Sequence, residues 1–275
     1  MKHVRHGASS RRAAVTVAAA FALSLVAFAA ALLLPQVWED KEPLSSDFQA
    51  GVAGGGLYRM MLLFHKSDGG MTGAVVLTTD THHMTMTAVG YAPGTAVRER
   101  SCSLGEVYRR EGTAAAGQAL CQAASLECET VLSFSVSDVA AFLIYLQDRL
   151  PCTLTEPVGE LPAGEVTLTP MQTTDVLRYT QWEAGARGQA YIHAEVIASL
   201  CTRYLTESRD LEADFGALTA LCDQRLNISQ FEAVRQELEV LAKANAGDLC
   251  AAYASDLPIY HTMSAIVGRG THSFC

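Results

Sequence analysis

Three apolar runs of strand length follow one another closely, and they constrain the fold more than any other feature of the chain. The runs are Leu57–His65 (LYRMMLLFH), Gly73–Asp80 (GAVVLTTD) and Met84–Val97 (MTMTAVGYAPGTAV). Only short polar turns, KSDGG and DTHH, separate them. Closely spaced runs of this kind predict three neighbouring strands of one sheet.

The third run breaks at the tip Ala92-Pro93-Gly94. In α/β proteins, a loop that follows a strand is where catalytic and binding residues usually lie. This tip carries no acid, base, nucleophile or cation. The sequence therefore predicts a turn without a catalytic group at a place where one is normally found.

Helices and further strands alternate in the rest of the chain. Helical patterns occupy residues 113–126, 137–151, 170–181, 188–205 and 227–245, and the stretches 131–135 and 164–169 have the pattern of strands. Ser137 is the predicted N-cap of the second helix and Pro151 its stop, while Ser229 and Glu232 have the spacing of a capping box. Strands that alternate with helices predict an α/β fold with helices on both faces of the sheet.

The N-terminal region has the pattern of a membrane anchor. Residues 13–34 form a run of 22 residues without a charge, and the preceding 12 residues carry four basic residues and no acid. About 20 apolar residues span a bilayer, and basic flanks stay in the cytoplasm. We therefore expect a single-pass protein of the cell membrane with a cytoplasmic N-terminus and an extracytoplasmic main domain. A cleaved signal peptide is the alternative.

The expected organisation follows from these patterns. Residues 39–56 are polar and rich in glycine, which is typical of a flexible tether. The predicted parts are a cytoplasmic tail at 1–12, a transmembrane helix at 13–34, a linker at 35–56, an α/β/α core at 57–207 and a C-terminal helical extension of the same domain at 208–275.

The charge balance limits the partners. Beyond the first 12 residues, 16 basic residues stand against 29 acidic ones. This excess of acid argues against nucleic acid as a partner. An anion could be bound only by a local cluster of arginines.

The eight cysteines all lie after residue 100. A domain of this size can bury a full core without disulfides, so reduced and buried thiols are one interpretation. The other is one or two bridges, most plausibly among Cys201, Cys222 and Cys250.

Eight stretches stand in the same order as the motifs of one known family. YRMMLLFHKSD, TGAVVLTTD and MTMTAVGYAPGTAV stand where that family typically has ILLVGID, DTILLVSID and ITLLSIPRDTYV in its first three strands. CSLGEVYRREG, LSFSVSDVAAFLIYLQDRLP, LTPMQTTDVLRYTQWE, IHAEVIASL and LNISQFEAV stand in the places of its later motifs. In these stretches the chain resembles the LytR-CpsA-Psr (LCP) family of Gram-positive cell envelopes. The resemblance covers most of the chain after residue 57 and implies a three-layer α/β/α sandwich.

The resemblance also implies that the family's charged residues have been lost. Pro93 and Gly94 stand where the family has Arg-Asp, and Thr72 stands where it has an acid that binds Mg²⁺. The family's later arginines and its later acid fall on positions that carry no basic residue here: Gln181, Glu183, Ala186, Gln189 and Ile192. The only charged residue among these five is Glu183, which stands in place of an arginine. Phosphoryl transfer needs cations on the phosphates and an oxygen-bound Mg²⁺. We therefore expect no catalytic residues and no cofactor, with Mg²⁺ required only if the chain is an enzyme after all.

Other residues could rebuild a site. Arg98, Arg100, Arg178 and Arg187 lie near the lost motifs and are the candidate anion-binding residues; the alternative is that they are ordinary surface arginines. A metal site from His65, His82 and His83 is conceivable but not expected, because neighbouring residues of a strand point to opposite faces.

Three hypotheses follow. The first is a non-catalytic LCP-like protein, a pseudoenzyme, that binds a polyprenyl-phosphate-linked glycan or a partner protein in cell-wall assembly. The second is an active phosphotransferase of the LCP type with a displaced site built on the four arginines. The third is an unrelated anchored α/β domain that binds proteins.

Overall fold

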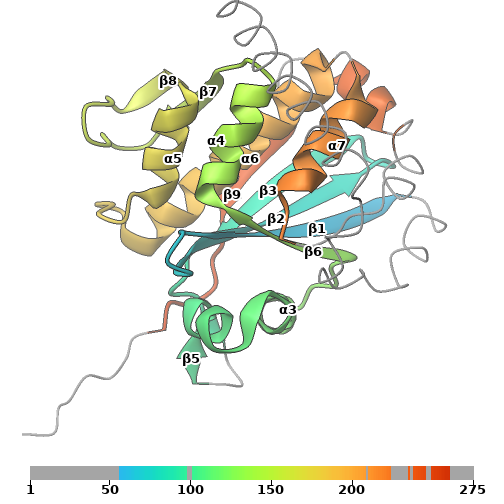
Figure 1. Ribbon diagram of the computed structural model, residues 1–275. Helices are drawn as coiled ribbons and strands as arrows, with labels where there is room; N and C mark the ends of the chain where they lie inside the picture. The colour runs from blue at the N-terminus through green and yellow to red at the C-terminus, as the bar shows by residue number, and fades with distance from the viewer. Residues whose placement is uncertain are drawn as a thin grey trace, which may run out of the picture. The chain divides into compact units, whose positions relative to one another are not determined.

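The computed structural model describes residues 56–97, 101–208, 210–223, 235, 238–245 and 249–260 (Figure 1). All of them belong to one compact unit, Glu42–Cys275. The predicted capping box at Ser229 and Glu232 and the predicted tether lie outside these residues, apart from Gly56.

A five-stranded mixed sheet forms the centre of this unit, in the order β6-β1-β2-β3-β9. Its strands are β1 (Leu57–His65), β2 (Met71–Asp80), β3 (Thr85–Tyr91), β6 (Thr130–Ser135) and β9 (Cys250–Ala254). The first three are antiparallel neighbours, as the three closely spaced apolar runs predicted. β6 runs parallel to β1, and β9 runs parallel to β3 at the opposite edge.

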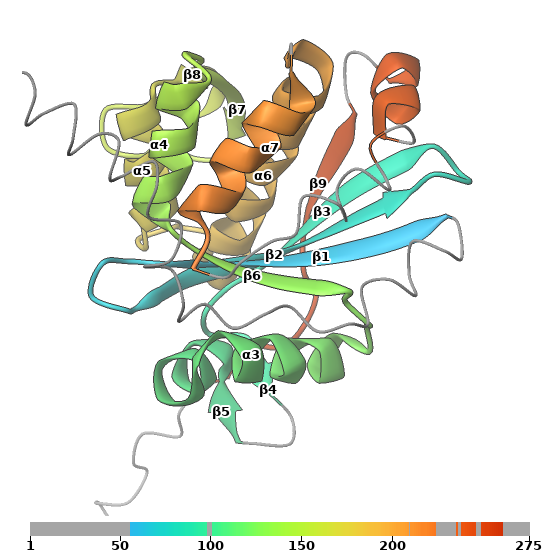
Figure 2. The ribbon, with the colours of Figure 1, turned by 45° about the vertical axis from the view of Figure 1, so that its right-hand side comes forward.

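Helices cover both faces of the sheet (Figure 2). α3 (Leu104–Ala124) lies on one face, and α4 (Val136–Tyr145), α5 (Pro170–Arg178), α6 (Gly185–Glu207) and α7 (Leu211–Leu221) lie on the other. The expectation of a mixed α/β fold is confirmed.

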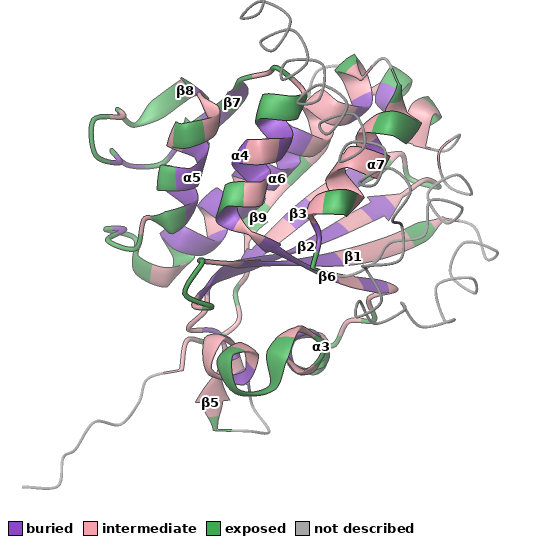
Figure 3. Cartoon of the chain, viewed as in Figure 1, coloured by how far each residue is buried: buried purple, intermediate pink, exposed green. Residues whose placement is uncertain are grey.

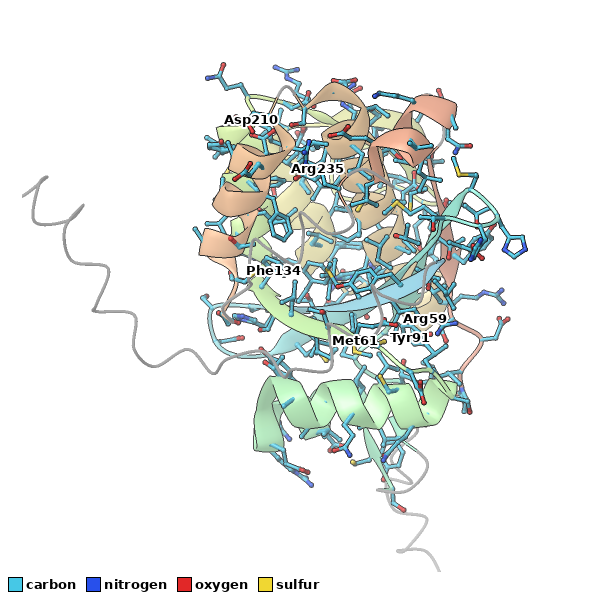
Figure 4. All side chains as sticks on the ribbon, turned by 90° about the vertical axis from the view of Figure 1, so that its right-hand side faces the viewer. Arg59, Met61, Tyr91, Phe134, Asp210 and Arg235 are labelled. Carbon is cyan, nitrogen blue, oxygen red and sulfur yellow. The ribbon has the colours of Figure 1, made fainter. Side chains whose placement is uncertain are left out.

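Each face of the sheet has its own hydrophobic core. Met61 and Tyr91 point toward α3, and Phe134 points toward the other helices (Figure 4). Side chains alternate between the two faces along a strand, so the continuous apolar run of β1 supplies both cores. Purple, the colour of buried residues in Figure 3, accordingly runs along the central strands.

Two small hairpins lie outside the central sheet. β4 (Ala96–Val97) pairs with β5 (Cys102–Ser103) before α3, and β7 (Leu150–Leu154) pairs with β8 (Gly164–Leu168) before α5. Leu150, Cys152 and Leu154 are buried while the residues between them are exposed, which is the period of a half-buried strand.

The predicted limits of the helix at 137–151 are wrong. Its N-cap is Ser135, whose backbone N–H donates to Asp138 in a capping box, and the helix ends at Tyr145. Pro151 does not stop the helix but lies within β7, after a turn at Leu146 and Gln147 that ends the helix.

The predicted localisation is also corrected. In the described part of the chain, no helix has the length and apolar character needed to cross a bilayer. Even the 23-residue α6 carries Arg187, Glu195, Arg203 and Glu207. The run at 13–34, on which the single-pass expectation rested, lies outside the described residues.

Candidate functional site

The positions that resemble the LCP active site gather at one end of the sheet. β1 ends there, β2 begins there, and β3 and β6 end there, because β2 runs antiparallel to β1 and β3 while β6 runs parallel to β1. The register between β1 and β2 passes over Thr72, since Phe64 pairs with Gly73 and His65 pairs with Met71. Thr72 therefore lies in a β-bulge, an irregularity that often redirects a side chain beside a functional site.

Thr72 is part of a buried, uncharged hydrogen-bonded cluster. Its hydroxyl donates to the Phe64 carbonyl over 3.2 Å, and its own carbonyl accepts from the Gln189 amide over 3.0 Å. His193, one turn further along α6, lies with Nε2 3.4 Å from the Thr72 hydroxyl. All three side chains are less than one-tenth exposed. A threonine and a glutamine thus close the position where the resemblance implies an acid and an arginine.

His193 is neutral at ordinary pH. Complete burial lowers the pKa of its imidazole to about 4. Nδ1 lies 2.9 Å from the Gln189 carbonyl, which can only accept, so the proton of the neutral ring is on Nδ1. The ring lies directly over Gly73, where an added Cβ would come within 2.9 Å of it. No space is left there for a ligand.

The tip after β3 is covered by the chain's own C-terminal segment. The backbone of Tyr260 donates to the Gly94 carbonyl, Ala96 donates to Pro258, and Thr95 forms a β-bridge with Ile259. Pro93 in turn accepts from the Gly105 amide in the first turn of α3. The tip therefore anchors two other segments of the chain, and this is its structural role.

A carboxylate holds the loop before α6. Glu156, which is buried, accepts hydrogen bonds from the backbone N–H groups of Glu183 and Ala184. Ala184 is the N-cap of α6 and has no side-chain cap of its own. Glu156 thus occupies the N-terminal end of a helix, a position that suits a bound anion.

Two of the four candidate arginines, Arg178 and Arg187, belong to the described residues, and they lie on different helices. Arg98 and Arg100 lie outside the described residues. Arg178 is exposed in the last turn of α5, whereas Arg187 is exposed in the first turn of α6 and pairs with Asp256 over 3.4 Å. Their role in anion binding stays a prediction.

Arg187 borders an open groove of about 870 Å³ beside the edge strand β9. The groove is lined from β3, α6, β9 and the residues after it, with three tyrosines among the lining residues: Tyr91, Tyr191 and Tyr253. Tyr253 is exposed, whereas burial raises the pKa of the Tyr91 hydroxyl to about 12. Arg187 and Asp256 also line a smaller cavity of about 190 Å³ beside Thr95 and Ile259, next to the covered tip.

A polar cluster that the sequence did not predict lies where β1 and β6 end. His65 Nε2 lies 3.0 Å from Asp223, which also accepts from the Ser133 hydroxyl. The hydrogen bond to Asp223 raises the pKa of His65, and burial raises the pKa of the nearby Asp138. Asp223 follows α7, more than 150 residues after His65, and no local pattern could have indicated that they meet.

The three histidines of the conceivable metal site lie at opposite ends of β1. His65 ends β1, whereas His82 and His83 follow Asp80, which pairs with Leu57 at the start of β1. Nine residues of extended strand separate the two ends by about 30 Å. Among the described residues, no three His, Cys, Asp or Glu side chains are grouped closely enough to hold a metal ion.

Neither a family model nor a curated protein matches the sequence. Solved structures do resemble the fold. A candidate transcription regulator from Eubacterium siraeum has 11% identity and a TM-score of 0.60, covering 72% of this chain and 81% of its own. B. subtilis TagV has 10% identity and a TM-score of 0.56, covering 71% and 83%. TagT bound to LIIa-WTA has 10% identity and a TM-score of 0.54, covering 72% and 78%.

TagV and TagT are LCP proteins. The fold is LCP-like. At this level of identity the likeness concerns the fold alone, and the chemistry has to be argued from the residues. The positions of the predicted losses differ in burial. Thr72, Gln189 and Ile192 are buried, and Gln181 and Glu183 are exposed on either side of the buried Trp182. Pro93, Gly94 and Ala186 are half-buried.

Proposed function

We propose that this protein is a non-catalytic LCP-like protein of cell-wall assembly, which binds a polyprenyl-phosphate-linked glycan or a partner protein without transferring the glycan. The observation that carries the proposal is the buried cluster of Thr72, Gln189 and His193 at the end of the sheet. The fold supports the cell-wall context, because TagT, which shares it, was solved with LIIa-WTA.

The cluster argues against transfer on physical grounds. Phosphoryl transfer depends on cations and Mg²⁺ that stabilise charge on the phosphoryl oxygens, and losing one such group costs about 10²–10³ in rate. Here a hydroxyl, an amide and a neutral imidazole fill the position, and their hydrogen bonds go mainly to the backbone carbonyls of Phe64, Thr72 and Gln189. Mg²⁺ prefers carboxylate oxygens and water, and the cluster offers neither a carboxylate nor, beside Gly73, an open volume.

The groove beside β9 is the proposed place for a glycan. Tyr253 offers an exposed aromatic ring, and Arg187 and Asp256 offer charged hydrogen-bonding groups at its border. A guanidinium can bind a phosphate through two parallel hydrogen bonds. A phosphorylated sugar chain would find both kinds of contact in this groove.

One observation favours the second candidate, an active phosphotransferase with a displaced site. Arg187 lines both cavities, and the smaller cavity adjoins the tip where the family has its Arg-Asp pair. If Arg98 and Arg100 also reached this cavity, three cations would meet there. This candidate requires Mg²⁺, whereas the non-catalytic proposal requires no cofactor.

Binding and turnover of a short-chain polyprenyl pyrophosphate by the full chain, with and without Mg²⁺, separate the two candidates. We expect binding without release of phosphate, and an affinity about tenfold lower in Arg187→Ala, since a charge-assisted hydrogen bond contributes about 1.5–3 kcal/mol. Arg178→Ala, an exposed arginine outside the groove lining, is the matched control and should bind as the wild type does.

Release of phosphate that depends on Mg²⁺ would contradict the non-catalytic proposal. In that case, the same assay on Ala variants of Arg98, Arg100, Arg178 and Arg187 would show which cations act. Absence of binding would remove the lipid-linked glycan as the ligand and leave a partner protein as the proposed occupant.

A further inference from the structure

Two cysteines face each other where α3 ends and β6 begins. Cys121 lies in the last turn of α3, and Cys128 lies two residues before β6. Ser125 adopts a left-handed conformation at the C-cap, with φ 52°, and Leu126 donates to the Cys121 carbonyl over 2.9 Å. This helix-ending turn reverses the chain and returns Cys128 to the side of Cys121.

The two thiols are in contact. The side chains of Cys121 and Cys128 interact through a hydrogen bond, and the Cys128 backbone also bonds to the Cys121 sulfur. Both residues are half-buried and pack against the core between the sheet and α3. A disulfide requires an S–S distance of about 2.05 Å, so the two free thiols have to approach one another further to form the bond.

The two thiols have different roles in such a reaction. The hydrogen bonds from Cys128 lower the pKa of Cys121 to about 7, and the same contact, together with burial, raises the pKa of Cys128. A thiolate is the attacking species in disulfide exchange. Cys121 is therefore the nucleophile, and Cys128 is the thiol that resolves the intermediate.

A second pair of neighbouring cysteines lacks this reactivity. Burial raises the pKa of Cys201 to about 12, and burial, together with the nearby Cys201, also raises the pKa of Cys250. Both thiols therefore stay protonated near neutral pH. Cys201 and Cys250 are two of the three cysteines among which the sequence analysis expected a disulfide. They provide the matched control for Cys121 and Cys128.

We propose that Cys121 and Cys128 form a reversible disulfide by exchange with a small-molecule disulfide. The Cys121 thiolate attacks one sulfur of the oxidant, forms a mixed disulfide and releases one thiolate. The Cys128 thiol, losing its proton to solvent, then attacks the Cys121 sulfur and releases the second thiolate. The protein loses two protons and two electrons, and the small disulfide is reduced to two thiols. The bridge ties the end of α3 to the start of β6.

Thiol mapping of the full chain in glutathione buffers tests this proposal. After equilibration at several ratios of oxidised to reduced glutathione, the chain is alkylated and digested with trypsin. The peptide 111–149 contains Cys121 and Cys128 but no other cysteine. We expect it to appear two hydrogens lighter and without alkyl groups in oxidising buffer, and to carry two alkyl groups after reduction.

Three comparisons make the result specific. Cys128→Ser should leave the mixed disulfide of Cys121 with glutathione trapped, whereas Cys121→Ser should show much slower modification of Cys128. Cys201→Ser with Cys250→Ser should not change the oxidation of peptide 111–149. If both thiols of this peptide remain open to alkylation in fully oxidised glutathione, or if the bridge forms only after the wild-type chain is unfolded in urea, the proposal is wrong. The wild-type measurement decides the matter even if a variant fails to fold.

Discussion

Helix α6 carries two stripes of side chains, and they are built in opposite ways. Gln189 and His193, four residues apart, point to the sheet and are fully enclosed. Arg187 and Tyr191, also four residues apart, border the open groove beside β9. Residues at this spacing lie on the same side of a helix. One helix thus joins a closed, uncharged region to an open, charged one.

The contrast shows what each region can do. In the closed region, each polar group has a partner within the protein, so its contribution is to stability. In the open region, the ion pair of Arg187 and Asp256 is exposed and contributes little to stability. Either side chain can therefore exchange its partner for a ligand at a small cost in free energy. The following predictions test this division through stability, beginning with the largest expected effect.

Gly90 is the residue that allows α6 to lie against the sheet. A Cβ added there would come within 1.7 Å of the Ala190 carbonyl oxygen. Gly90→Ala should therefore force α6 away from β3 and lower the free energy of unfolding by about 3 kcal/mol or more, measured by urea denaturation.

Gly216 is the matched control, because it lies inside α7 and a Cβ there would meet nothing within 4 Å. Gly216→Ala should raise the free energy of unfolding by about 0.5–1 kcal/mol, the difference in helix propensity. If Gly90→Ala behaved like Gly216→Ala, the close contact of α6 with the sheet would be refuted.

His193 should make the protein sensitive to acid. Its pKa is about 4 in the folded chain and 6.5 in the unfolded chain, so between these values the unfolded chain binds more protons. The stabilisation is complete above pH 6.5 and is lost as the pH falls toward 4. We expect it to amount to about 3 kcal/mol, measured as the free energy of urea unfolding at successive pH values.

His193→Gln removes the titrating group. The free energy of unfolding should then change less between pH 6.5 and pH 4 than in the wild type, whatever the effect of the substitution at neutral pH. His83→Gln is the control, since His83 is exposed and pairs with Asp80 in a turn. Equal pH profiles for the wild type and His193→Gln would mean that the imidazole is not buried as a neutral group.

The sequence predicted the sheet better than it predicted the candidate site. Leu57–His65 and Gly164–Thr169 have local patterns that by themselves indicate strands, and the structure has strands there. β9 could not be predicted in this way, because the stretch Cys250–Ala254 is extended through pairing with β3, far away in the chain. The same holds for Asp223, which only the folded chain brings to His65.

The resemblance identified Thr72 and Gln189 as altered positions, but it did not indicate what replaced the lost charges. His193 has no local signature, since a single histidine in a helix fits many environments. Glu156 lies in the loop between β7 and β8, and only the tertiary fold brings its carboxylate to the N–H groups of Glu183 and Ala184 before α6. The loss of a charged residue can be read from the sequence. The residues that replace its interactions are brought together only by long-range contacts.

His65 should affect the pH profile in the opposite direction to His193. The hydrogen bond to Asp223 raises its pKa in the folded chain. Its contribution is therefore present below pH 6.5 and is lost as the pH rises through the folded pKa. Both side chains are partly exposed, so we expect less than about 1 kcal/mol.

Asp223→Asn should remove this contribution and lower stability at pH 6 more than at pH 8. The acids that face His65 are Asp223 and Asp138, and Tyr108 stacks on its ring. Ser133 also contacts Asp223, so its loss affects more than His65. His65→Gln with Asp223→Asn separates the two contributions, and a loss in Asp223→Asn that does not vary with pH would show that His65 is not charged there.

The open groove should tolerate substitution better than either polar cluster. Arg187 and Asp256 are 73% and 89% exposed at their side chains, and exposed ion pairs contribute little to stability. Arg187→Ala and Asp256→Asn should each change the free energy of unfolding by less than about 0.5 kcal/mol in urea denaturation. Thr72→Val, which keeps the shape but removes one buried hydroxyl from the closed cluster, should cost about 1–3 kcal/mol because partners of that hydroxyl stay buried. A loss of stability in Arg187→Ala as large as in Thr72→Val would mean that Arg187 is a structural residue. In that case Arg187 would be needed for folding, and the proposal that the groove is the functional surface of the protein would be wrong.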